Sequence, residues 1–301
     1  MRRIHFIEIH DQPWVPASLR DAVTDALQFG FNLLRIYVPV VPLLERALDA
    51  TQNQIDSLPP EHGRSIVDLC SGGAGPWLDL SRRLNRQSLK SDGTGREAPK
   101  VDVRIRLTDK YPNVRAFQKT KEASENYITF DSRSIDAMNV PADLKGLRTL
   151  FTSFHHFPPD EARAILQNAV NAGEGIGIFE VPRRAPLTVA LTFALVLLLF
   201  LGTPWIRPFR WSRLLWTFLI PIIPAVLLFD GVVSCLRAYS PQELEEVIGK
   251  LNFSEQRNQY RWEIGECGGG ISRSPVTYLI GYPVNDPEPV SGACIKDGSL
   301  P

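Results

Sequence analysis

The sequence predicts an α/β fold with a mainly parallel sheet, and three features of the chain predict it. Strand-like and helix-like segments alternate through its middle, two strand-like segments near its end lack a helix between them, and a long apolar segment interrupts the pattern. Alternating strands and helices form right-handed βαβ units, whose parallel strands are covered on both faces. We expect the parallel strands at residues 65–69, 101–107, 127–130, 149–154 and 175–181.

The helices follow from apolar periodicity and from residues that begin helices. Apolar residues recur at helical spacing through residues 19–38, which predicts an amphipathic N-terminal helix, and again through residues 77–84. Two further helices are expected to begin at Asn113 and at Pro159, each between two strands.

The C-terminal part of the domain has its own signals. Ser240 with Glu243 three residues later predicts a capping box at the start of a helix. Segments 259–264 and 276–281 then predict two antiparallel strands that form a hairpin.

Composition and charge exclude several classes of protein. Lys and Arg total 33, as do Asp and Glu, and a formal net charge of zero argues against nucleic-acid binding by bulk charge. With 44% hydrophobic and 22% charged residues, disorder is excluded for the bulk of the chain. The four cysteines form no CxxC pair, so we expect no metal site, no disulfide framework and a reducing compartment. The N-terminal residues lack the uninterrupted apolar run of a secretory signal, which predicts a cytoplasmic start.

A long apolar insertion distinguishes this chain from an ordinary α/β protein. Residues 185–206 and residues 214–229 contain no charged side chain. As helices they would be about 33 Å and about 24 Å long, against about 30 Å for the hydrocarbon core of a bilayer. The insertion follows the fifth strand, and the final hairpin must return to the same sheet. Both ends of the insertion therefore lie on one side of any membrane.

Three arrangements of this insertion remain open: a two-pass hairpin, a re-entrant or in-plane pair, and a soluble apolar lid over the site. A two-pass hairpin would place the arginines of the connecting segment across the membrane, against the positive-inside bias. Pro221 and Pro224 would also break a regular span. We therefore favour a shallow hairpin immersed from the cytoplasmic face of a membrane. The arginines are Arg207, Arg210 and Arg213 in the connection, with Arg183, Arg184 and Arg237 at the outer ends.

The residues that carry chemistry follow the first three strands. The segment IVDLCSGGAGPW, residues 66–77, ends a strand in Asp68 and continues into small residues that let the backbone approach a ligand closely. The free N–H groups of the following helix favour a nucleotide-like ligand. Neither the dinucleotide pattern GxGxxG nor the P-loop pattern GxxxxGK followed by Ser or Thr is present. Instead, Asp109 ends the second strand, where a carboxylate can accept both ribose hydroxyl hydrogens, and Asp136 follows the third strand.

These residues resemble those of the class I S-adenosylmethionine-dependent methyltransferases, over residues 64–183 and more weakly over residues 237–283. The resemblance implies a Rossmann-like methyltransferase fold: a mainly parallel seven-stranded sheet with an antiparallel C-terminal hairpin, N-terminal helices and an inserted apolar helical hairpin. It implies S-adenosyl-L-methionine as the cofactor, with Asp109 at its ribose and Asp136 and Ala137 near its adenine. The turn after the first strand would hold the methionine part of the cofactor. The turn residues so assigned are Asp68, Cys70, Ser71, Gly72, Gly73 and Gly75.

The segment TLFTSFHHF, residues 149–157, is similar to the family's segment that borders the transferable methyl group. One interpretation makes His155 or His156 the general base that deprotonates the methyl acceptor. The other makes them a loop pair, with one ring packed and one solvated. Glu180 and Tyr239 are open to two similar interpretations, since each either faces the acceptor or is structural.

The turn departs from the family pattern, because the first and third glycines of the usual motif are Cys70 and Ala74 here and Gly75 comes one place late. Two hypotheses of function follow. The first is methyl transfer to a small or lipophilic acceptor at the membrane surface, and the second is a membrane-tethered cofactor-binding module without transferase activity. An NAD-dependent oxidoreductase ranks third because its fingerprint is absent. The acceptor, its reacting atom and the oligomeric state stay open. The expected parts are an N-terminal helical region at 1–60, a methyltransferase domain at 61–184 and 238–285, the insertion at 185–237, and a flexible tail at 286–301.

Overall fold

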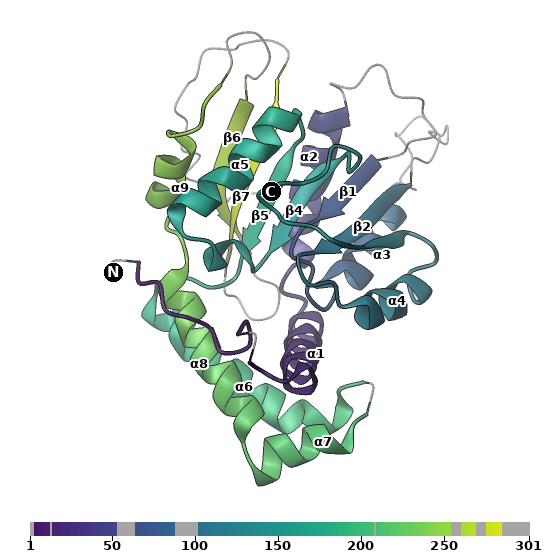
Figure 1. The fold of residues 1–301 in the computed structure, drawn as a ribbon, viewed down its shortest axis with the longest axis vertical. Helices are drawn as coiled ribbons and strands as arrows, with labels where there is room; N and C mark the ends of the chain where they lie inside the picture. The colour runs from purple at the N-terminus through teal and green to yellow at the C-terminus, as the bar shows by residue number, and fades with distance from the viewer. Residues whose placement is uncertain are drawn as a thin grey trace.

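A computed structural model shows a central sheet with helices on both faces and a separate helical layer at one end (Figure 1). The predicted C-terminal tail lies outside the described residues. The structure describes residues 3–12, 14–52, 64–87, 102–207, 209–253, 260–268 and 275–284.

The sheet has seven strands in the order β3-β2-β1-β4-β5-β7-β6. The strands β1 to β5 are parallel, and β7 runs antiparallel to both β5 and β6. This confirms the predicted sheet and its C-terminal hairpin. The strand order changes direction between β1 and β4, and ligands of open α/β sheets bind at the carboxyl edge beside such a switch point. The strands are β1 (Arg64–Asp68), β2 (Val103–Asp109), β3 (Ile128–Ser134), β4 (Leu147–Phe151), β5 (Ile176–Glu180), β6 (Tyr260–Cys267) and β7 (Val276–Pro283).

Helices cover both faces because alternate strand residues point to opposite sides of a sheet. Ile66 of β1 belongs to a core shared with α2, α3 and α4, and the next residue, Val67, belongs to a core shared with α5 and α9. Asn113 caps α4 as predicted, because its side chain accepts the Ala116 N–H at 3.1 Å. The helices are α2 (Val41–Gln52), α3 (Trp77–Gln87), α4 (Val114–Glu122), α5 (Pro159–Ala172) and α9 (Pro241–Ile248), and both halves of the predicted capping box are present on α9.

The N-terminal helix is shorter than its apolar periodicity predicts. Instead of one helix across residues 19–38, α1 (Ala17–Leu33) ends before Arg35, whose φ of 51° is left-handed. A left-handed residue cannot continue a right-handed helix. The chain then turns through η1 (Val38–Val40) into α2, and the axes of α1 and α2 differ by 70°. As a result, α2 packs on the sheet, whereas α1 leaves it.

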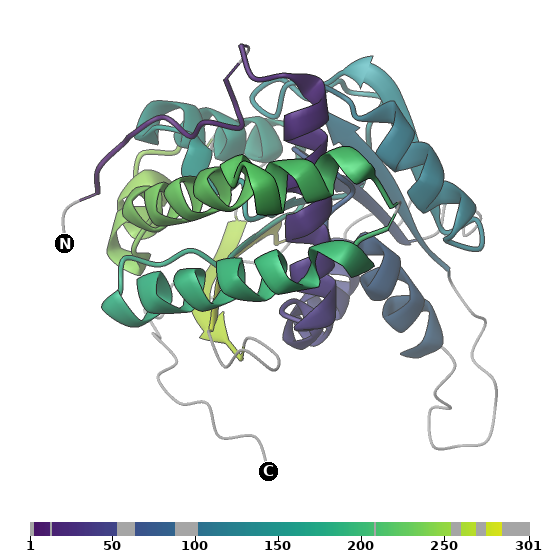
Figure 2. The same ribbon diagram turned by 90° about the horizontal axis from the view of Figure 1, so that it is seen from below.

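The apolar insertion forms a helical hairpin that packs on α1. Figure 2 shows its two long helices, α6 (Pro186–Gly202) and α8 (Ile222–Arg237), side by side and crossing α1. Apolar side chains of all three helices form a third core, which includes Val23, Leu199 and Leu227. The segments between α6 and α8 are η4 (Thr203–Trp205), α7 (Trp211–Leu214) and the π-helical turn η5 (Leu215–Leu219).

The second apolar segment is broken at its prolines, as the sequence predicts. Pro221 is the N-cap of α8 and Pro224 lies in its first turn, where a proline needs no backbone N–H partner, and the helical segments Trp211–Leu219 and Ile222–Arg237 are bent by 73° relative to each other. By length and composition, one described helix, Pro186–Trp205, is apolar enough to cross a membrane, and 17% of its apolar window is buried. Two bent helix pairs, at 70° and 73°, meet the same criterion only if each pair counts as one span.

Candidate functional site

Asp68, the last residue of β1, organises the turn that follows it. The residue is 2% exposed, and its carboxylate accepts the Ser71 hydroxyl at 2.6 Å and the Thr149 hydroxyl at 2.7 Å. Burial raises the pKa of Asp68 to about 7, although these two hydroxyl donors lower it. The side chains of Asp68 and Ser71, both predicted to hold the cofactor, thus bind each other and tie the turn to β4.

The turn has a left-handed backbone at four residues. The φ angles are 57° at Cys70, 51° at Gly72, 78° at Ala74 and 47° at Gly75. Left-handed φ explains why the resembled family has glycines in this turn, and it costs a residue with a Cβ about 1–2 kcal/mol. Cys70 and Ala74 therefore carry backbone strain. A Cβ added at Gly72 or Gly75 would meet no atom within 4 Å, so both glycines border open space that a ligand can occupy.

The opposite side of the turn packs on the N-terminal helix. A Cβ on Gly73 would lie 2.4 Å from Cγ2 of Thr24, and the Gln28 side chain donates to the Gly73 carbonyl at 2.9 Å. Gly73, which the sequence assigns to the cofactor, is thus the point at which α1 closes over the turn.

Asp109 and the turn converge, which is the arrangement that the cofactor prediction requires. The Gly72 N–H donates to Oδ2 of Asp109 at 2.8 Å, and the Tyr111 N–H donates to Oδ1 at 2.8 Å. Burial raises the pKa of Asp109, and the two N–H donors oppose that rise. Asp109 does not cap α4, because Asn113 does. Each carboxylate oxygen keeps a lone pair for a further donor.

Asp136 lies at the same edge of the sheet. Its Oδ2 accepts Lys110 Nζ at 2.9 Å, and its Oδ1 accepts the Met138 N–H at 2.9 Å, while the neighbouring Ala137 is buried. Because Lys110 follows Asp109 directly, the structure brings the residues predicted for ribose and adenine together. The Met138 contact also makes Asp136 the cap of a short turn.

His155 and His156 lie in the turn η3 (Phe154–His156) after β4. His155 is 1% exposed, and its Nδ1 lies 2.5 Å from Oε2 of Glu180. Although burial lowers the pKa of His155, Glu180 and Glu8 together raise it to about 9. His156 is half-buried, and its Nδ1 lies 2.7 Å from Oδ2 of Asp11. One ring is therefore packed and the other is partly solvated.

Glu180 and Tyr239 make structural contacts in this region. Glu180 Oε1 accepts the N–H groups of Ser153 and Phe154 at 3.0 Å and 2.8 Å, and so anchors the start of η3. The Tyr239 hydroxyl donates to the Phe157 carbonyl at 2.7 Å. Both contacts fix the loop that carries the two histidines.

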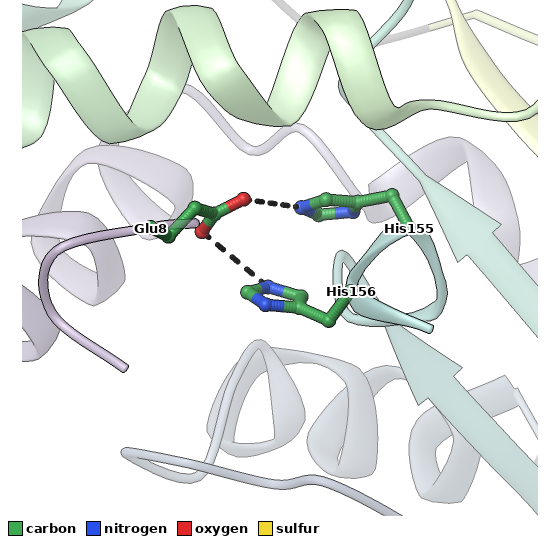
Figure 3. A group of neighbouring side chains, drawn as sticks. All are labelled: Glu8, His155 and His156. Carbon is green, nitrogen blue, oxygen red and sulfur yellow. Dashed lines mark ion pairs between the residues drawn. The ribbon is translucent and has the colours of Figure 1, made fainter. Parts of the chain in front are cut away.

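The sequence analysis missed Glu8, whose carboxylate faces both histidines (Figure 3). Its carboxylate is buried, with Oε1 at 3.5 Å from Nε2 of His155 and Oε2 at 3.6 Å from Nε2 of His156. Burial favours the neutral form of Glu8, but the facing imidazoles of His156 and His155 outweigh it and hold the pKa below its usual range.

Asp230 of α8 holds the N-terminal segment that brings Glu8 to this position. It accepts the Ile9 and His10 N–H groups at 2.6 Å and 3.1 Å, and it lies 2.8 Å from Nδ1 of His10. Two signals pointed to this cluster: the titratable residues of the motif HFIEIHDQ, and Asp230 as the one acidic residue between positions 185 and 237. Neither signal indicates that these segments pack against η3.

A cavity lies between this cluster and the insertion. Its empty volume is about 670 Å³, which includes its open mouth, and residues of α1, α6 and α8 give it a mostly apolar wall surface. Thr152, Val181 and Pro182, just after β4 and β5, also line it. Glu8, His10 and Asp230 of the polar cluster line the cavity, whereas His155 and His156 do not. The insertion thus covers the carboxyl edge of the sheet and encloses an apolar site there.

No protein-family model and no curated protein matches this sequence. Among solved structures, the plantazolicin methyltransferase BpumL in complex with SAH is 11% identical to this chain. The match covers 89% of this chain and 98% of the BpumL chain, with a TM-score of 0.47. An O-methyltransferase family protein from Burkholderia thailandensis is 17% identical over 81% of this chain and 57% of its own, with a TM-score of 0.37. A structure from Rhodobacter sphaeroides is named for putative Zn-dependent alcohol dehydrogenases. It is 11% identical, the match covers 87% of this chain and 98% of the other chain, and the TM-score is 0.43.

These likenesses concern the fold alone. The sheet order, the parallel β1 to β5 and the antiparallel β7 are those expected of the class I S-adenosylmethionine-dependent methyltransferases, so the chain has that fold. Its function is argued from the site.

Proposed function

We propose that this chain is an S-adenosyl-L-methionine-dependent methyltransferase that acts on a small or lipophilic acceptor at the cytoplasmic face of a membrane. The observation that carries the proposal is the contact between the Gly72 N–H and Oδ2 of Asp109. This contact brings a turn with open space at Gly72 and Gly75 next to a carboxylate with free lone pairs, as binding of an adenosyl group with a methionine tail requires.

The residues present fit this cofactor. Asp109 would accept the hydroxyl hydrogens of its ribose, and the turn from Cys70 to Gly75 would follow its methionine tail, while Asp136 and Ala137 would border its adenine. When bound, the cofactor supplies a sulfonium group that activates the methyl group for in-line transfer. The protein contributes alignment and exclusion of water, and α1 with the insertion closes the edge of the sheet for that purpose.

The cavity supports a lipophilic acceptor. Most of its wall surface is apolar and its polar residues include Glu8, His10 and Asp230, which suits a largely hydrocarbon molecule with one hydroxyl, thiol or amine. Glu8 lines the cavity and faces His155 and His156, which do not line it, so Glu8 would relay a proton that leaves the acceptor for either histidine.

The outer face of the insertion supports membrane association. Leu187, Leu197 and Leu201 of α6 are 58–69% exposed, and they share one side of this helix. Trp205 and Trp211, 68% and 78% exposed, flank the connection near Arg207, as is typical of side chains at a membrane interface. If the hairpin lay in the plane of the membrane, this outer face would be immersed in the lipid. The face of the insertion that lines the cavity would stay packed against the domain.

Methyl transfer is tested with S-adenosylmethionine labelled in its methyl group and a total lipid extract. We expect label in the lipid fraction and tight binding of both cofactor and demethylated product by calorimetry. Binding of NAD in place of S-adenosylmethionine would contradict the proposal.

Membrane association is tested by liposome flotation. Leu197→Glu places a charge on the outer face of α6, where no core contact is lost, and is expected to reduce flotation strongly. Phe253→Glu is the matched control, since Phe253 is 44% exposed and follows α9, away from the insertion. Equal flotation of the two variants, or an intact chain that stays unbound, would reject the membrane part and leave the cofactor part unaffected.

The left-handed Cys70 and Ala74 favour a second candidate, a membrane-tethered cofactor-binding module without transferase activity. Such a chain would bind S-adenosylmethionine but leave every acceptor fraction unlabelled.

A further inference from the structure

The cluster around Glu8 has the spacing of a metal site. Oε1 of Glu8 lies 3.5 Å from Nε2 of His155, and Oε2 lies 3.6 Å from Nε2 of His156 (Figure 3). One ligand atom from each residue can be chosen so that all three lie within 4.8 Å of one another. Both separations exceed a normal hydrogen bond. Two ligands at about 2.0–2.1 Å from a tetrahedral ion stand about 3.4 Å apart, which is close to the observed spacing.

Both imidazoles are oriented by a carboxylate on the ring nitrogen that faces away from Glu8. Nδ1 of His155 lies 2.5 Å from Glu180, and Nδ1 of His156 lies 2.7 Å from Asp11. Metal-binding histidines usually donate their other N–H to such a carboxylate, which fixes the tautomer and leaves a lone pair on Nε2. The same arrangement on two adjacent histidines directs both Nε2 atoms toward the Glu8 carboxylate.

A buried nitrogen without a hydrogen-bond partner supplies a second observation. Among the described residues, Nε2 of His155 has no hydrogen-bond partner, and bulk water cannot replace one because the residue is only 1% exposed. Buried polar atoms are normally satisfied, and an unsatisfied one calls for an explanation such as an ion. A metal ion between His155 and Glu8 would satisfy this atom.

The charges around the cluster favour a dication. Four carboxylates surround it, from Glu8, Asp11, Glu180 and Asp230, against the guanidinium groups of Arg3 and Arg237. With neutral imidazoles the formal charge is therefore minus two. Ser234 fixes the Glu8 carboxylate through a hydrogen bond of 2.9 Å to Oε1.

We propose that Glu8, His155 and His156 bind a divalent first-row transition metal ion, with Zn²⁺ as the best match to two imidazoles and one carboxylate. Three protein ligands leave a fourth tetrahedral position open, as in catalytic zinc sites. Glu8 also lines the cavity, so the ion would lie next to the space in which the acceptor would lie. The site departs from the sequence prediction, which expected no metal.

The role of the ion rests on the proposed function. With both histidines bound to the ion and unable to accept a proton, an acceptor hydroxyl or thiol at the open position would lose its proton to solvent, because a bound dication lowers the pKa of its ligand. Its lone pair would then form the bond to the methyl carbon as the bond from that carbon to sulfur breaks. The electron pair of the broken bond stays on sulfur, which becomes a neutral thioether.

Metal binding is tested on the full chain after treatment with a chelator. Zn²⁺ is titrated by calorimetry and Co²⁺ by its visible absorption bands, which are intense in tetrahedral sites. We expect one ion per chain, and roughly 100-fold weaker binding in Glu8→Gln and in His156→Gln. Asp11→Asn, which removes an orienting carboxylate, is expected to weaken binding by about 10–100-fold. The matched control is His5→Gln, since His5 is exposed and outside the cluster.

Absence of a tetrahedral Co²⁺ spectrum in the wild-type chain would overturn the proposal, as would unchanged Zn²⁺ affinity in either ligand variant. His156 is half-buried, so His156→Gln decides the question even if Glu8→Gln does not fold. The titrations need no cofactor. Metal binding without S-adenosylmethionine binding would sink the proposed function alone, and the reverse result would sink the metal site alone.

Discussion

The two halves of the sheet's carboxyl edge are built in different ways. At the β1–β2 half, Asp68, its turn and Asp109 come from two consecutive strands and contact one another directly. At the β4–β5 half, the polar cluster combines the N-terminal segment around Glu8, the turn η3 and Asp230 of α8, which are more than 70 residues apart in sequence. The first half is built from residues that are closer in sequence. The second depends on tertiary assembly, in which the insertion contributes Asp230.

The largest expected effect on stability is at Glu180, which belongs to the β4–β5 half. Glu180→Ala removes the acceptor of two backbone N–H groups and the partner of buried His155, and should lower the free energy of unfolding by about 3–5 kcal/mol. Glu180→Gln retains a carbonyl acceptor and should lose less. Urea unfolding measures both, and an alanine variant as stable as the wild type would show that the β4–β5 half does not depend on this carboxylate.

The next effect concerns pH and the β1–β2 half. The pKa of Asp68 is about 7 in the folded chain against 3.8 normally, so the folded state binds the extra proton and stability falls as pH rises from about 4 to 7. Asp68→Asn cannot titrate, and should gain about 2–4 kcal/mol relative to the wild type across this window. Thermal unfolding at several pH values measures the difference. Parallel pH profiles for the two proteins would contradict the assigned burial.

A smaller effect tests the contact of α1 with the turn. Gly73→Ala places a methyl group against Cγ2 of Thr24 and should cost about 1–3 kcal/mol. Thr24→Ser removes that methyl group while keeping a hydroxyl for the Arg20 carbonyl, and should restore most of the loss in the double variant. Additive losses in the double-mutant cycle would show that α1 and the turn are not in contact.

The smallest expected effect on stability is at the capping box of α9, which its local sequence predicts. Ser240→Ala removes the side-chain half of the capping box on α9 and should cost about 1 kcal/mol, with little change at either half of the edge. Urea unfolding and cofactor titration together measure this. A large loss of cofactor affinity would show that α9 is coupled to the site.

The contrast between the halves also explains how much the sequence could predict. The strands, the capping box and the Asp68 to Asp109 convergence follow from local patterns and from sheet topology, in which neighbouring parallel strands end at one edge. The position of Glu8 depends on Asp230 binding the backbone of Ile9 and His10, a contact between segments about 220 residues apart. The apolar periodicity likewise predicts one helix that continues past Arg35, because a single left-handed residue leaves the apolar pattern on either side of it unchanged.

The central claim is that the turn after Asp68 and the carboxylate of Asp109 bind one adenosyl-bearing molecule, and calorimetric titration of S-adenosylmethionine tests it most directly. We expect Asp109→Ala to bind at least tenfold more weakly than the wild type, a loss of about 1.4 kcal/mol or more. Asp109→Asn should fall between them, and Asp143→Ala, which removes an exposed carboxylate paired with Arg133, should bind as the wild type does. Equal affinity in the wild type and Asp109→Ala would contradict the account.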